Sequence, residues 1–111
     1  MGAIEQYRTI LRHVMADYAV GGRQNGDLRT ELVVDEHQNH FEVISVGWDG
    51  EERIHHSVLH VDIIDGKVWI QNNNTDRQIG KELVEAGIPR EDIVLAFHPA
   101  ELRKYTEFAV G

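Results

Sequence analysis

Residues 28–73 read LRTELVVDEHQNHFEVISVGWDGEERIHHSVLHVDIIDGKVWIQNN, and this stretch decides the fold. Its apolar residues follow a period close to two, which is typical of β-strands, and turn-forming residues separate the runs. Asp49-Gly50 and Asp65-Gly66 are pairs that suit the positive φ angles of a type I′ hairpin turn. We therefore predict a four-stranded antiparallel meander, with strands at 28–34, 41–48, 53–64 and 67–71.

The third of these strands contains a change of phase. Its apolar residues occupy even positions at Ile54 and Val58 but mostly odd positions from Leu59 onward. A β-bulge adds one residue to one strand of a pair and would bring both halves onto one face. We therefore predict a bulge near Ser57 and Val58.

Helical patterns flank the meander. At the N-terminus apolar residues recur at helical spacing, namely Ile4, Tyr7, Leu11, Val14, Met15 and Tyr18. They predict an amphipathic helix over 4–18 that Gly21-Gly22 ends, with a loop at 22–27. A second helix is predicted from a capping box formed by Thr75 and Gln78 to a C-cap at Gly87, since Pro89 prevents continuation.

The chain after this helix is short. Residues 93–97 form an apolar run that predicts a buried fifth strand, parallel to the strand before the helix because a crossover connects them. Residues 99–105 predict a last helical turn. The prediction is a single α+β domain over 1–111, with a four-stranded antiparallel meander, an N-terminal helix, a second helix and a short fifth strand.

Composition excludes several function classes. The 111 residues contain no cysteine, which rules out disulfides, iron–sulfur clusters, thiolate zinc sites and cysteine nucleophiles. The N-terminus does not resemble a signal peptide, and no apolar run is long enough to cross a membrane, so we expect a cytoplasmic protein. Acidic residues outnumber basic ones by 19 to 11, which disfavours direct binding to nucleic acid and would attract a basic protein partner. The other interpretation is that the acidic surface only keeps a small protein in solution.

The histidines raise the question of a metal site. His60 and Asp62 share a face of the third strand, as does His56 if no bulge intervenes, and such side chains can hold a divalent ion. The other interpretation is that they are polar residues of a partly exposed sheet face, and we assign no metal ligand and no cofactor. His37 and His40 flank a turn and are predicted to be solvated.

No catalytic residue is assigned either. His98 precedes Pro99 after a buried strand, a place where catalytic groups often lie, but no serine or cysteine nucleophile accompanies it in a recognisable setting. Trp48 and Trp69 are predicted to anchor the core or an interface, with a ligand pocket against either as an alternative. A basic cluster near the C-terminus could contact phosphate or an acidic surface; its members are Arg90, Arg103 and Lys104, with Tyr105 beside them.

Two long blocks of the sequence carry a resemblance to a known family. They are HVDIIDGKVWIQ at 60–71, and ELVEAGIP at 82–89 with DIVLAFHP at 92–99, followed by Arg103, Tyr105-Thr106 and Phe108-Ala109. Together with the amphipathic opening helix, they resemble the XisI family, the fdxN-element excision controlling factors of cyanobacteria. The family-motif or partner-binding candidates are His60, Asp62, Trp69, Gln71, His98, Pro99, Arg103 and Tyr105.

The resemblance implies a role in programmed excision of a DNA element during heterocyst differentiation. A separate site-specific recombinase cuts and rejoins the DNA, and a XisH-like protein is the expected partner. We therefore predict a non-enzymatic accessory factor that acts through protein contacts, with a homo-oligomer left open. The alternative is a metal-dependent hydrolase or a metal-tuned regulator that uses His60 and Asp62, with His98 as a further candidate.

Overall fold

The computed structural model describes residues 2–21 and 27–111. In chain order, its elements are α1 (Ala3–Gly21), β1 (Arg29–Asp35), β2 (His40–Asp49), β3 (Glu52–Ile64), β4 (Lys67–Asn73), α2 (Ile79–Ala86), the 3₁₀ helix η1 (Arg90–Asp92), β5 (Ile93–Leu95) and the 3₁₀ helix η2 (Ala100–Tyr105). The α+β class is confirmed, and no helix within these residues is both long and apolar enough to cross a membrane.

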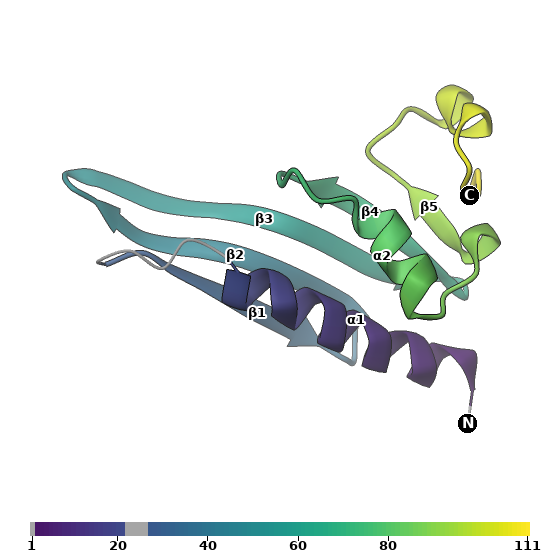
Figure 1. Cartoon of the computed structure of the whole chain (residues 1–111), viewed down its shortest axis with the longest axis horizontal. Coiled ribbons are helices and arrows are strands. Elements are labelled where there is room, and N and C mark those ends of the chain that lie inside the picture. The colour runs from purple at the N-terminus through teal and green to yellow at the C-terminus, as the bar shows by residue number, and fades with distance from the viewer. Residues whose placement is uncertain (1, 22–26) are drawn as a thin grey trace.

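The strands form one five-stranded sheet in the order β1-β2-β3-β4-β5 (Figure 1). Strands β1 to β4 pair antiparallel and β5 pairs parallel with β4, both as predicted. The sheet is therefore mixed and has five strands, which corrects the description of a four-stranded antiparallel sheet. The helix α2 is the reason, because its crossover returns the chain to run in the direction of β4. β5 ends at Leu95 and is shorter than the predicted 93–97 run.

Two bulges set the register of the sheet. Val43 lies opposite Leu59 and Ile44 opposite Ser57, so Val58 is the extra residue of β3 and the predicted bulge is confirmed. A second shift, which the sequence did not predict, separates the pairs His60–Asn72 and Val61–Ile70 and makes Gln71 the extra residue of β4. Beyond the first bulge, odd positions of β3 face the helices and even positions face away.

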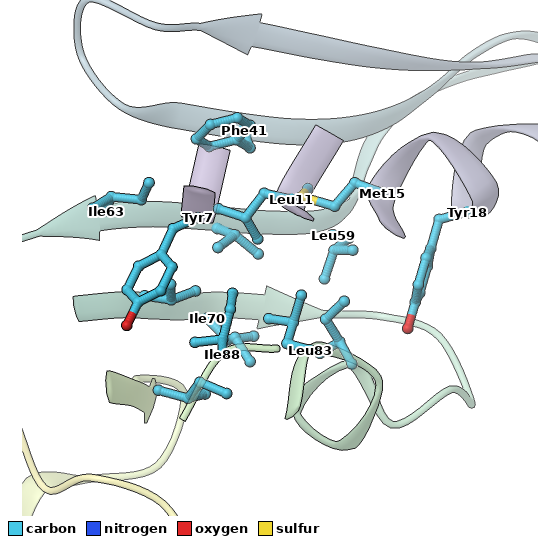
Figure 2. Packing of buried hydrophobic residues seen from close by; sticks show 14 of the residues in the cluster. Tyr7, Leu11, Met15, Tyr18, Phe41, Leu59, Ile63, Ile70, Leu83 and Ile88 are labelled. Carbon is cyan, nitrogen blue, oxygen red and sulfur yellow. The ribbon is translucent and has the colours of Figure 1, made fainter. Parts of the chain in front are cut away.

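The helices α1 and α2 lie on the same side of the sheet (Figure 1). The core fills the space between these two helices and the sheet, and Figure 2 shows Leu11 and Met15 of α1 beside Leu59 of β3. Burial of such side chains is the main favourable term in folding. The buried cluster comprises Tyr7, Leu11, Met15, Tyr18, Phe41, Val43, Leu59, Val61, Ile63, Val68, Ile70, Ile79, Leu83, Ile88 and Ile93.

The helix boundaries differ in part from the predictions. α1 continues past the apolar pattern of 4–18 to Gly21, the first residue of the pair that was predicted to end it. The loop predicted at 22–27 lies outside the described residues except for Asp27. The capping box is wrong, because α2 begins at Ile79 and no side chain caps its first turn. Thr75 instead donates its hydroxyl to Asn73 Oδ1 at 2.6 Å and accepts from the Arg77 amide.

The C-terminal end of α2 is confirmed at Gly87. This residue has a φ of 120°, and its amide donates to the Leu83 and Val84 carbonyls. The Ile88 amide donates to the Leu83 carbonyl at 3.0 Å, which completes a Schellman-type ending. Ile88 is thereby folded back into the core, where only 1% of its surface is exposed.

Two tyrosines of α1 connect this helix to the following segments. The Tyr7 hydroxyl donates to Asp92 of η1, and the Tyr18 hydroxyl donates to Glu82 Oε2 of α2 at 2.7 Å. Burial, followed by the hydrogen bond and the charge of Asp92, raises the pKa of Tyr7 to about 12. The neutral hydroxyl is therefore the form that the fold stabilises.

This raised pKa predicts a loss of stability in alkali. Since the pKa of Tyr7 moves from 10.0 to about 12 on folding, its contribution is complete below pH 10 and is lost as the pH rises from 10 to 12. Tyr7→Phe should therefore show a smaller decrease in the free energy of unfolding across this window, measured by urea denaturation. Tyr105→Phe, a change at an exposed tyrosine, serves as the control. Equal decreases for the Tyr7→Phe and unmutated proteins would contradict the prediction.

Candidate functional site on the outer sheet face

The candidate site lies on the face of the sheet that points away from α1 and α2, here called the outer face. In β2, Phe41 and Val43 are buried against the helices, so strand alternation directs His40 and Glu42 outward. In β3 the same alternation, in the phase that the Val58 bulge sets, directs two further polar side chains outward. They are His60 and Asp62.

The carboxylate of Asp62 is the centre of this cluster. Its Oδ1 atom lies 2.9 Å from His40 Nδ1 and 3.1 Å from His60 Nε2. Its Oδ2 atom accepts a hydrogen bond of 3.3 Å from Gln71 Nε2, which the second bulge places beside it. Asp62 therefore has polar partners on both of its oxygen atoms, supplied by three adjacent strands.

His40 connects the cluster to a second carboxylate. Its Nε2 atom lies 3.3 Å from Glu42 Oε1, and its ring centroid lies 4.4 Å from that of His60 at an angle of 55°. Burial alone would raise the pKa of Glu42, but the Ser57 hydroxyl, His40 and His60 outweigh this effect and lower it. Glu42 is thereby held as a carboxylate that can accept a hydrogen bond from the imidazole.

The structure changes the prediction for three histidines. His40 was predicted to be solvated, as the exposed His37 is, but only 33% of its side chain is exposed and Asp62 contacts it. His56 lies opposite the inward-facing Ser45, because the Val58 bulge separates its phase from that of His60. His98 is absent from the group of possible metal ligands among the described residues, which consists of His40, His60 and Asp62.

The two tryptophans both lie on or near the outer face. Trp69 lies opposite Asp62 in the β3–β4 pair and is half-buried, with the Arg103 guanidinium 5.5 Å from its ring centroid. Trp48 is 47% exposed and is therefore not a core residue; Arg53 lies 5.4 Å from its ring centroid. Cavities of ≈ 660 and ≈ 240 Å³ are lined by other residues, so neither gives a ligand pocket against a tryptophan.

The remaining candidates form a separate C-terminal group. Arg103 donates through Nε to the His98 carbonyl at 3.0 Å and through Nη2 to the Ala96 carbonyl at 3.3 Å. Pro99 is the N-cap residue of η2, and Tyr105 is 76% exposed at its end. The guanidinium of Arg103 is thus engaged with backbone carbonyls and Trp69, so this arginine braces the chain after β5.

This bracing role predicts a local effect of substitution. Arg103→Ala should destabilise the protein by about 1.5–3 kcal/mol, the range for hydrogen bonds to a charged group, and should increase amide exchange over 96–110. Arg103→Lys should not restore the protection of these amides from exchange, because the lysine ammonium cannot reproduce the planar set of donors of the guanidinium. Lys104→Ala, at the adjacent exposed position, is the matched control. Unchanged exchange in Arg103→Ala would contradict the bracing role.

Known proteins resemble this chain in both sequence and structure. The family model described as XisI protein matches residues 1–110, whereas no curated protein matches the chain. A XisI-like protein from Anabaena variabilis ATCC 29413 is 39% identical over 97% of this chain and 99% of that chain, with a TM-score of 0.92. The fdxN element excision controlling factor XisI from the same strain is 32% identical over 99% and 100%, with a TM-score of 0.85. The chain therefore belongs to the XisI family.

Proposed function

We propose that the chain is a non-enzymatic controlling factor for programmed excision of a DNA element, and that it acts in the cytoplasm by binding a XisH-like protein. Family membership and likeness to the solved fdxN element excision controlling factor support the excision role. The observation that carries the mode of action is the outer sheet face, which neither α1 nor α2 covers. In this proposal a separate site-specific recombinase performs the DNA chemistry.

The outer face has the composition of a protein-binding surface. Trp48, Val33 and Ile64 lie there and are 47%, 42% and 40% exposed. Exposed apolar groups beside polar ones are typical of surfaces that another protein covers, and tryptophan is enriched among residues that dominate binding energy. We therefore place the proposed contact on this face, with Trp48 as its principal apolar anchor.

Charge supports a protein partner over naked DNA. The net charge of −8 repels a duplex and attracts a basic protein surface. Arg103, the basic residue of greatest interest for phosphate contact, is engaged with backbone carbonyls. We therefore expect the basic surface of the complex to come from the partner.

The positions of the serines support a non-enzymatic role. The sequence contains two serines, Ser45 and Ser57, and no cysteine. Both serines lie within strands, away from the sharp strand-to-helix turn that exposes a nucleophile in hydrolases. Neither has the setting for acyl transfer.

A pull-down with a XisH-like protein tests the proposal. Trp48→Ala and Val33→Lys should each weaken binding at least about tenfold, because truncation of an anchor or insertion of a charge damages an apolar contact. Val20→Lys is the matched control, since Val20 is exposed on α1, away from the outer face, and should bind as the unmutated chain does. Affinity is measured by titration calorimetry of the two purified proteins.

Two results would contradict the proposal. One is the absence of any complex between the unmutated chain and the XisH-like protein. The other is submicromolar binding of duplex DNA by the isolated chain at about 0.15 M salt, where screening leaves only close contacts. The non-enzymatic role also predicts that a plasmid incubated with the chain alone remains uncut.

A further inference from the structure

We propose that His40, His60 and Asp62 form a binding site for a late first-row divalent cation such as Zn²⁺, with a fourth coordination position open to water. This inference goes beyond the proposed function, because it needs no partner and no DNA. It rests on three side chains whose chemistry suits a metal ion. His60 and Asp62 come from β3, and the pairing of the strands brings His40 of β2 beside them, although it lies at least 20 residues earlier in the sequence.

The distances between the donor atoms suit a small cation. One ligand atom from each of the three residues lies within 4.8 Å of the others, and Asp62 Oδ1 lies 2.9 Å from His40 Nδ1 and 3.1 Å from His60 Nε2. Zinc bonds to nitrogen and oxygen imply ligand separations of about 3.3 Å in a tetrahedron. The two separations from Asp62 therefore lie within a few tenths of an ångström of the tetrahedral value, and side-chain rotation of the two histidines would admit the ion.

A supporting shell surrounds the three residues. The second nitrogen of His40 lies 3.3 Å from Glu42 Oε1, and the second oxygen of Asp62 accepts from Gln71 at 3.3 Å. Histidines that bind metals usually donate their other nitrogen to a carboxylate or carbonyl, which fixes the ring and its tautomer. Glu42 and Gln71 therefore orient two of the ligands before an ion arrives.

The site is both held in place and accessible. The strands β2 and β3 are internal strands of the sheet, each hydrogen-bonded on both sides. The side chains of His40, His60 and Asp62 are 33%, 29% and 20% exposed, so solvent reaches them from the outer face. An ion could therefore enter without opening the fold and would retain a water molecule on the open side.

The donor set determines which cations the site should select. Two imidazole nitrogens and one carboxylate oxygen suit Zn²⁺, Co²⁺, Ni²⁺ and Cu²⁺, whereas Mg²⁺ and Ca²⁺ prefer oxygen ligands alone. We therefore expect uptake of Zn²⁺ and Co²⁺ and negligible uptake of Mg²⁺. Co²⁺ is the informative spectroscopic probe, because a tetrahedral complex absorbs strongly in the visible range.

Titration calorimetry of the full chain, without a histidine tag and after treatment with a chelator, tests the inference. The unmutated chain should bind one Zn²⁺, and His40→Ala and His60→Ala should each weaken this binding at least about tenfold. Glu42→Gln should weaken it by roughly 10- to 100-fold, the usual effect of removing a supporting partner. Asp62→Asn retains the side-chain shape and gives an independent variant where an alanine variant fails to fold.

His55→Ala is the matched control, because His55 is an exposed histidine of the same strand and should leave binding unchanged. Circular dichroism verifies that each variant is folded. The inference is overturned if the unmutated chain takes up neither Zn²⁺ nor Co²⁺, or if a folded His40→Ala/His60→Ala double variant binds as the unmutated chain does. The metal titration contains no partner protein, so its failure would not contradict the proposed binding of a XisH-like protein. Failure of the pull-down would in the same way not contradict metal binding.

Discussion

The extra residue Val58 in β3 determines which side chains of this strand are buried. In a regular strand successive side chains point to opposite faces, and Ile54 and Leu59 lie an odd number of residues apart. They can therefore share a face only if the strand contains a change of phase. The bulge absorbs one residue, so β3 can pair with every residue of β2 while Leu59 and its odd-numbered successors face the helices. The central strand of the sheet, and with it the core layer, depends on this one irregularity.

The same bulge creates the polar cluster on the other face. Once Leu59, Val61 and Ile63 are buried, the residues between them must point outward, and these are His60 and Asp62. The burial of Phe41 and Val43 in β2 directs His40 and Glu42 to the same side. Core packing and the outer site are therefore two consequences of one register, and a slip by one residue would place charged groups in the core.

Much of this arrangement could be predicted from alternation and turn chemistry, but not all of it. The Asp65-Gly66 turn, the Val58 bulge and the Gly87 ending are local signals, and each is found where the sequence indicated. The type I′ turn predicted at Asp49-Gly50 is wrong, because Asp49 belongs to β2 and only Gly50 of this pair has a positive φ. The role of His40 was missed although its signal was present: the apolar Phe41 and Val43 alternate with His40 and Glu42, which places the two polar residues on the opposite face. The Gln71 bulge could not be predicted, because it depends on how β4 pairs with β3. The backbone contacts of Arg103 could not be predicted either, because they depend on the folded path of the chain after β5. The capping box failed because Thr75 hydrogen-bonds to Asn73 and Arg77, two residues away on either side, so one local motif competes with another.

Because α1 and α2 cover only one face of the sheet, packing restricts the side chains of that face more than those of the outer face. Residues that face α1 and α2 must fill a fixed volume, and the fully buried Leu11 and Leu59 illustrate how little freedom remains there. Residues on the outer face must only keep the strands paired and their own polar groups satisfied, which Asp62 does by contacting both histidines and Gln71. Chemistry on that face can therefore change without loss of the fold. This separation explains how a small domain can carry exposed apolar side chains and a preformed cluster of histidine and carboxylate side chains on one surface.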